Sequence, residues 1–149
     1  MSKPVIDHLS GRAVTLAASG VRTVSANGDG VSVPSHYRRW IVLLSVTNAD
    51  TDGGDLLDVY VDVSIDGGTK WLNAIHFGQV LGTDSATYEY AVLDPTTPGT
   101  STIAVTSDAA VDTVRPTLFG PTMRARWVVV DTGSDDATFT FAVTAYGQP

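Results

Sequence analysis

Apolar and polar residues alternate along several stretches of the chain, the pattern of β-strands with one buried face. In residues 57–65 every second residue is apolar, from Leu57 to Ile65, and polar residues such as Asp58 and Asp62 stand between them. Residues 139–146 alternate in the same way, from Phe139 onward. For both stretches we expect the apolar side chains to face a core and the intervening ones to face water.

Other segments complete an all-β pattern. Residues 37–46 form a longer apolar run rich in β-branched and aromatic residues, which favours a buried strand. Shorter strands are expected at residues 13–17, 21–25, 71–77, 87–92, 102–106 and 123–130. Gly/Asp-rich turns separate them, for example at residues 66–68 and 132–136, and no segment has helical periodicity. The sequence therefore predicts a single antiparallel β-sandwich, jelly-roll-like in form.

Two segments are less regular than the rest. Residues 1–11 are expected to form an N-terminal arm, and residues 12–149 the sandwich domain. Within that domain, residues 94–122 contain four prolines and many Ser, Thr and Gly residues, so we expect a long irregular loop. Loops of this length are usually functional or become ordered on a partner.

Composition and charge exclude several functions. The 149 residues are 43% hydrophobic and 17% charged, include no cysteine, and carry a net charge of −7. A chain of this kind can form one core without disulfides, and its acidity disfavours binding to nucleic acid. No signal peptide is expected at the N-terminus, and the longest apolar run is too short to span a membrane.

The residues that could carry chemistry are few. Asn48, Asp50, Asp52 and Gly53 match the first half of a calcium-binding loop, but Val59 stands where the bidentate glutamate is expected. The alternative interpretation is a surface turn, and we expect no cofactor. The histidines lack the spacing of a zinc site. No Gly-x-Ser-x-Gly nucleophile motif occurs, and the sequence predicts no enzyme.

Arginines and tyrosines suggest binding instead. The pairs Arg38–Arg39 and Arg124/Arg126 are expected either to bind aspartates within the molecule or to dock onto an acidic protein surface. Tyr88 is expected to share a strand face with Tyr90. Such a pair suits a protein contact and, as the alternative, a sugar-stacking platform.

Two parts of the chain carry a resemblance. The turn at residues 64–71 partly resembles the Asp-box hairpin of sialidase-type propellers, a structural motif whose enzymatic activity we do not transfer. Residues 55–80, with Trp71 after the turn, resemble small β-sandwich proteins of tailed-bacteriophage virions. So does an expected late hairpin that runs from Met123 through Trp127 to Val143, within residues 123–147. These virion proteins include capsid decoration, or cement, proteins.

The resemblance implies a non-enzymatic structural protein made in the host cytoplasm and bound to the exterior of the virion capsid. Its expected partners are the major capsid protein and further copies of itself, in a homotrimer. A tail or connector location stays open, and a calcium-assisted carbohydrate-binding or adhesin module is the alternative function. The expected partner-binding residues lie in the arm, the basic segment and the long loop: Pro4, Ile6, His8, His36, Arg38, Arg39, Arg115 and Phe119.

Overall fold

The computed structural model describes residues 11–34, 36–49, 51–96, 101–115 and 120–149. These parts of the chain contain strands and no helix. The strands are β1 (Arg12–Arg22), β2 (Ala26–Asn27), β3 (Val31–Ser32), β4 (Arg39–Asn48), β5 (Leu56–Ser64), β6 (Leu72–His76), β7 (Val80–Leu81), β8 (Thr87–Leu93), β9 (Thr113–Val114), β10 (Thr122–Val130) and β11 (Phe139–Gln148).

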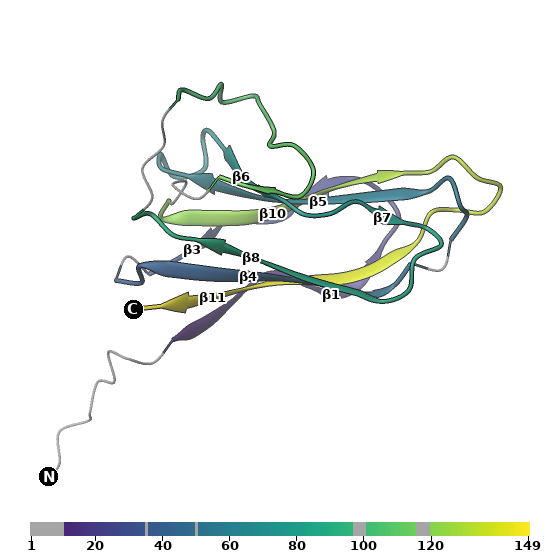
Figure 1. Cartoon of the computed structure of the whole chain (residues 1–149), viewed down its shortest axis with the longest axis horizontal. Coiled ribbons are helices and arrows are strands. Elements are labelled where there is room, and N and C mark those ends of the chain that lie inside the picture. The colour runs from purple at the N-terminus through teal and green to yellow at the C-terminus, as the bar shows by residue number, and fades with distance from the viewer. Residues whose placement is uncertain (1–10, 35, 50, 97–100, 116–119) are drawn as a thin grey trace, which may run out of the picture.

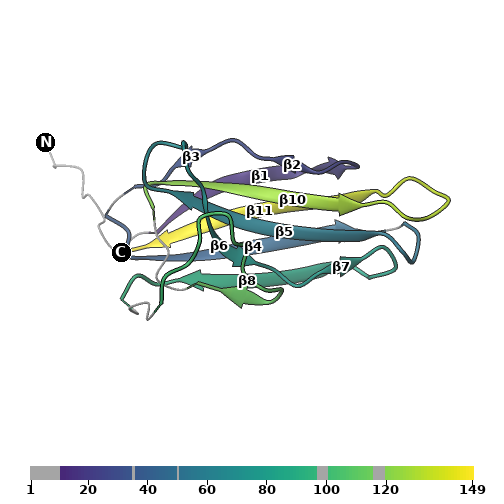
Figure 2. The same ribbon diagram turned by 90° about the horizontal axis from the view of Figure 1, so that it is seen from above.

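The strands form two packed layers (Figure 1). One is a four-stranded sheet with the order β1-β11-β4-β8. The other is a seven-stranded sheet with the order β2-β10-β5-β6-β9, in which β3 also pairs with β10 and β7 with β5. Neighbouring strands are antiparallel throughout, and the long ones run along the length of the molecule (Figure 2). The predicted antiparallel β-sandwich is confirmed.

The core lies between the two sheets and follows the alternation of the sequence. Every second residue of β4, β10 and β11 is buried, with Trp40, Met123 and Phe141 among the fully enclosed side chains. Burying a large aliphatic or aromatic side chain contributes roughly 1.5–3 kcal/mol. The inward residues of these central strands therefore supply much of the apolar burial that stabilises the fold.

Strand β5 departs from the expected pattern. Tyr60, Asp62 and Ser64 are buried, although their side chains point away from the core. The prediction that this face of β5 meets water is wrong, because residues 101–115 fold back over the outer face of the seven-stranded sheet (Figure 1). Ile65 was expected to face the core, yet it lies in the turn beyond β5 and is 70% exposed.

Three further expectations need correction or refinement. Residues 13–17 and 21–22 belong to one strand, β1, which has register shifts where it pairs with β11, whereas residues 23–25 lie outside any strand. Residues 102–106 do not form a strand; the strand of that region is β9, which pairs with the end of β6. The expected hairpin over residues 123–143 is wrong, because β10 and β11 belong to different sheets and their connection crosses the sandwich.

The turn between β5 and β6 matches the sequence pattern. Gly67 and Gly68 have positive φ angles of 75° and 94°, which glycine adopts without steric cost. The Ser64 hydroxyl accepts a hydrogen bond from the Gly68 N–H at 2.9 Å. The Asp66 carboxylate accepts one from the Lys70 N–H, also at 2.9 Å. These short-range bonds fix the hairpin.

Candidate functional site

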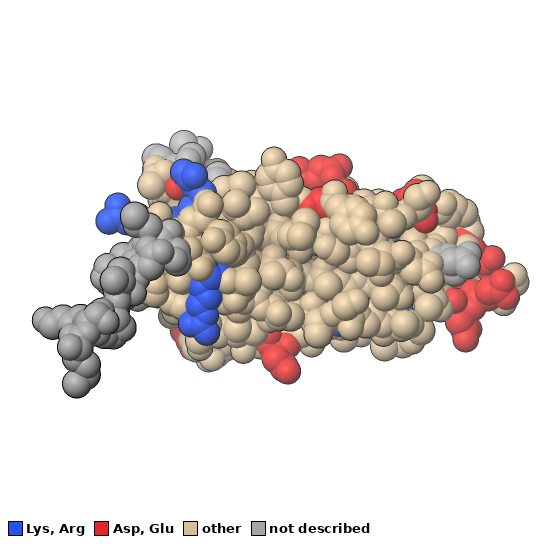
Figure 3. Space-filling view, turned by 90° about the horizontal axis from the view of Figure 1, so that it is seen from below, with Lys and Arg blue, Asp and Glu red and all other residues tan. Residues whose placement is uncertain are grey.

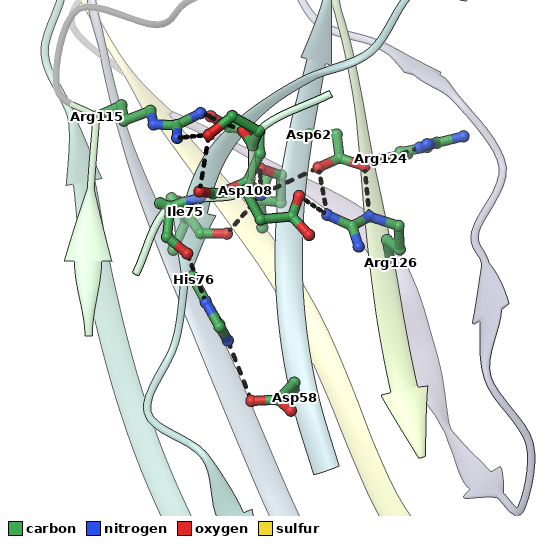
Figure 4. Close-up of polar contacts among 12 residues, drawn as sticks. Asp58, Asp62, Ile75, His76, Asp108, Arg115, Arg124 and Arg126 are labelled. Carbon is green, nitrogen blue, oxygen red and sulfur yellow. Dashed lines mark hydrogen bonds and ion pairs between the residues drawn. The ribbon is translucent and has the colours of Figure 1, made fainter. Parts of the chain in front are cut away.

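A polar network lies on the outer face of the seven-stranded sheet, beneath the 101–115 segment (Figure 4). Its centre is Asp62, which is 2% exposed. One oxygen of its carboxylate accepts hydrogen bonds from Nε of Arg124 at 3.2 Å and from Nε of Arg126 at 3.0 Å. Nη2 of Arg126 also contacts the Asp108 carboxylate at 2.6 Å. Of the two interpretations of Arg124 and Arg126, the structure supports pairing within the molecule.

Asn73 joins this centre to the overlying segment. Its side-chain amide donates to the Asp62 carboxylate at 3.1 Å, and its side-chain oxygen accepts the Ala109 N–H at 2.8 Å. Arg115 also links the overlying segment to β6, because its Nη1 donates to the backbone oxygens of Ser107 at 2.8 Å and of Asn73 at 3.1 Å. Arg115, expected to bind a partner, thus makes hydrogen bonds within the molecule that fasten the 101–115 segment to β6.

His76 extends the same network toward β5. Its Nδ1 lies 2.8 Å from the Ala109 carbonyl oxygen, and its Nε2 lies 3.1 Å from a carboxylate oxygen of Asp58. The Tyr60 ring stacks on the imidazole with 4.1 Å between the ring centroids. Both ring nitrogens of His76 therefore have an oxygen partner within the molecule.

The electrostatics of the network are balanced internally. Burial by itself lowers the pKa of Arg126, but its hydrogen bonds and attraction to Asp62 and Asp108 outweigh burial and raise that pKa. The guanidinium of Arg126 also lies 4.0 Å from the centroid of the Tyr60 ring. Burial, followed by the negative charge of Asp58, raises the pKa of Tyr60. The network therefore holds fixed charges and a neutral phenol, an arrangement that braces the sheet.

A basic end of the sandwich collects several residues that the sequence marked for partner binding. We define the basic end by Arg12, His36, Arg38 and Arg39, which are all exposed. Arg39 begins β4, and the backbone N–H of Arg38 donates to the Gln148 oxygen near the C-terminus. Strand β1 begins at this end with Arg12, which is paired with Gly147 near the C-terminus (Figure 2). Pro4, Ile6, His8 and Phe119 lie outside the described residues.

A depression of about 400 Å³ lies at the basic end. Its lining consists of Arg38, Arg39, Asp94, Thr96, Gln148 and Pro149. Arg39 lies 3.5 Å from Asp94, and the Arg39 side chain is still 54% exposed. The pair is a weak surface contact of the kind worth under about 1 kcal/mol. The Arg39 guanidinium is therefore available to a carboxylate of another molecule.

An uncharged face covers the outside of the four-stranded sheet (Figure 3). We define it by the outward residues in the middle of β4, β8 and β11: Ile41, Leu43, Ser45, Tyr88, Tyr90, Val92, Ala142, Thr144 and Tyr146. Tyr88 is 64% exposed and Tyr90 is 72% exposed. As expected, both tyrosines point to the same face, because side chains alternate between the two faces along β8. A contiguous face of this kind is typical of an interaction surface.

The proposed half of a calcium loop has a different role in the structure. An oxygen of the Asp52 carboxylate accepts the backbone N–H groups of Ser134 at 2.6 Å and Asp135 at 2.8 Å. Asp55 next to it accepts the Thr132 N–H at 2.9 Å, and this hydrogen bond is the main reason that the pKa of Asp55 is lowered. The described residues include no group of three or more His, Asp or Glu side chains placed to hold a metal ion, and Asp50 is outside them. Asp52 and Asp55 instead tie two connecting loops together.

No family model, curated protein or solved structure matches this chain. The described parts of the chain also contain no helix that could cross a membrane.

Proposed function

We propose that this chain is a non-enzymatic structural protein that binds another protein through its basic end, as a decoration protein on the outside of a bacteriophage capsid. The observation that carries the proposal is the grouping of exposed Arg38 and Arg39 around one depression, at the end of the sandwich where His36 and the start of β1 also lie. The partner is the major capsid protein, and the protein belongs to the virion exterior.

The charge distribution supports a docking role for this end. The chain carries a net charge of −7, yet the basic end exposes guanidinium groups. Arginine is favoured at protein interfaces because its planar fork binds carboxylates through two hydrogen bonds. An acidic patch on a partner is therefore attracted to this end and repelled by most of the remaining surface.

The capsid as the partner is supported by the resemblance of residues 55–80 and 123–147 to small virion β-sandwich proteins. In the fold these residues include β5, β6 and β10, which are neighbours in one sheet, and β11 opposite them. A shell protein needs a rigid domain and extensions that reach neighbouring subunits. Many identical attachments on one shell would add multivalent strength.

A structural role also accounts for the polar residues best suited to acid–base chemistry. Asp58 and His76 contact each other, and both His76 ring nitrogens are used within the network beneath the 101–115 segment. A catalytic base has to reach a substrate proton. This pair is committed to holding the fold together, in line with a protein that performs no reaction.

The experiment that tests the proposal is cosedimentation of the full chain with undecorated capsids. We expect saturable binding that weakens at least several-fold in Arg38→Gln, because a docking charge is lost. Thr106→Asp changes the net charge by the same amount on the exposed 101–115 segment, and it should bind like the parent. Absence of binding to capsids and to other virion components would overturn the proposal.

The exposed tyrosines favour a second candidate function, carbohydrate binding by an adhesin-like module. Tyr88 and Tyr90 stand on one strand with most of their surface exposed, and aromatic faces of this kind can stack on sugar rings. A glycan array tests this alternative. Binding that disappears in Tyr88→Ala supports it, and an array without signal excludes it for the glycans present.

A further inference from the structure

We infer that the uncharged face is the contact between two copies of this chain, which pack face to face with their long axes antiparallel. The inference does not depend on the proposed function, because it rests on the composition of this face and on the charges at its two ends.

The composition of the face suits contact with another protein layer. A row of paired residues crosses its centre from Thr144 through Leu43 to Tyr90, and the next row runs from Tyr146 through Ile41 to Val92. None of the residues that define the face is charged. The whole chain has 25 charged side chains, of which 9 are Lys or Arg and 16 are Asp or Glu. Packing two such faces would remove apolar and tyrosine surface from water without burying a charge.

The charges lie at opposite ends of this face. The basic end has Arg39 at the first position of β4, next to the last residues of β11. At the other end, Asp131, Asp135 and Asp136 occupy the connection that leads into the first residue of β11, and all three are exposed. Figure 3 shows basic atoms toward one end of the face, and acidic atoms at the other end and along its two long edges. We call the second group the acidic end.

This separation identifies a second copy as the occupant and fixes its direction. A two-fold axis across the strands, along the Thr144–Leu43–Tyr90 row, would place this central row on its counterpart in the other copy. The row from Tyr146 to Val92 would then face the partner's row from Ala142 to Tyr88. The same rotation would bring the basic end of each copy over the acidic end of the other. A two-fold axis along the strands would instead bring the acidic ends together, which like-charge repulsion disfavours. Charge complementarity thus selects the antiparallel arrangement.

The arrangement also explains why the face carries tyrosines at β8. Tyr90 is opposite Leu43 near the middle of β4, so it lies near the two-fold axis and would meet its own counterpart. Tyrosine is enriched at interfaces because its ring buries apolar area while the hydroxyl still finds a polar partner. In an isolated monomer the same ring stays in water.

Sedimentation of the full chain at several concentrations tests the inference. We expect a dimer of twice the 15.6 kDa chain mass. Thr144→Arg on β11 should weaken dimerisation at least about tenfold, because it places a charge in the middle of the contact. Leu43→Arg on β4 should do the same. Thr106→Arg, the same substitution on the 101–115 segment, should leave the dimer intact.

The direction of packing has its own readout. The double variant Asp135→Lys/Asp136→Lys should weaken an antiparallel dimer, because its acidic end would no longer attract the partner's basic end. The same variant would strengthen a parallel dimer, and that result would overturn the antiparallel arrangement. A monomer at all concentrations would overturn the inference. A dimer that Thr144→Arg leaves unaffected would also overturn it, and so would a trimer, the state that the virion resemblance implies, if Thr144→Arg leaves it unaffected. The sedimentation experiment contains no capsid, so a failure of the dimer inference would not decide whether the chain binds capsids.

Discussion

Asp62 and Arg126, 64 residues apart in sequence, share an ion pair at 3.0 Å on the outer face of the seven-stranded sheet. The same carboxylate oxygen of Asp62 also contacts Nε of Arg124. The carboxylate of Asp108, in the overlying segment, contacts Nη2 of Arg126. The side chain of Asp62 is only 3% exposed. Asp62, in a nearly dry position, and Asp108 therefore supply two negative charges opposite the two arginines.

Replacing Asp62 by Asn should be strongly destabilising. It would leave Arg124 and Arg126 close together without their shared carboxylate, and breaking a buried ion pair in this way costs about 3 kcal/mol. The free energy of unfolding, measured by urea denaturation, checks the prediction. Asp94→Asn breaks the exposed pair with Arg39 and should cost less than about 1 kcal/mol. Equal losses in the two variants would show that burial adds nothing at Asp62.

Replacing Asn73 by Ala should loosen the 101–115 segment. The Ala109 N–H would lose its acceptor at 2.8 Å, and Asp62 would lose the amide donor at 3.1 Å. We expect hydrogen exchange of the Ala109 amide to speed up, while amides of the four-stranded sheet keep their protection. The exposed residue Thr102 supplies the control, because Thr102→Ala should change neither set. Unchanged exchange at Ala109 in Asn73→Ala would contradict this role.

Asp55 should make the fold sensitive to acid. The hydrogen bond from the Thr132 N–H lowers the pKa of Asp55 in the folded protein, although burial opposes the shift. An unfolded aspartate has a pKa of about 3.9, so the contribution of Asp55 to stability is complete well above that pH. It is lost as the pH falls through the lower pKa of the folded state, because the unfolded chain then binds the proton more readily.

Unfolding midpoints measured from neutral to acidic pH check the prediction. Asp55→Asn should be less stable at neutral pH and should lose less stability on acidification than the parent. Asp131→Asn, at an exposed position in the acidic end, should follow the parent curve. An Asp55→Asn curve parallel to that of the parent would rule out this contribution.

A side chain at Gly67 should destabilise the turn after β5. With φ at 75°, Gly67→Ala forces an L residue into the left-handed region at a cost of about 1 kcal/mol, even though its Cβ would have no atom within 4 Å. Gly53→Ala is the matched control: its Cβ would meet only Thr83 at an ordinary 3.6 Å. Thermal unfolding should therefore show a lower midpoint for Gly67→Ala than for Gly53→Ala, and the reverse order would contradict the conformational argument.

The sequence predicted the parts of the fold that depend on local pattern. Alternating residues in β11 and the apolar run of β4 identify core strands, because side chains in a strand point to opposite faces by turns. The Asp66–Gly68 turn is equally local. The buried outer face of β5 could not be predicted, because it depends on residues 101–115, which begin 37 residues beyond the end of β5 and contact Asn73, His76 and Arg126.

The candidate sites divide in the same way. His36, Arg38 and Arg39 are neighbours in sequence, so their grouping at one end could be predicted. The uncharged face was indicated only by Tyr88 and Tyr90, because its other members come from β4 and β11 and meet through strand pairing. The apparent half of a calcium loop includes a contact that the sequence did not indicate: Asp52 binds the backbone of Ser134, which is 82 residues away. Local spacing carries no information about such distant donors.

Electron cryomicroscopy of undecorated capsids incubated with the full chain tests the central claim most directly. The account predicts added density for this domain at regular positions on the capsid exterior, with the basic end of His36, Arg38 and Arg39 toward the capsid surface. Capsids without added density would contradict it, and so would density in which no basic end contacts the shell.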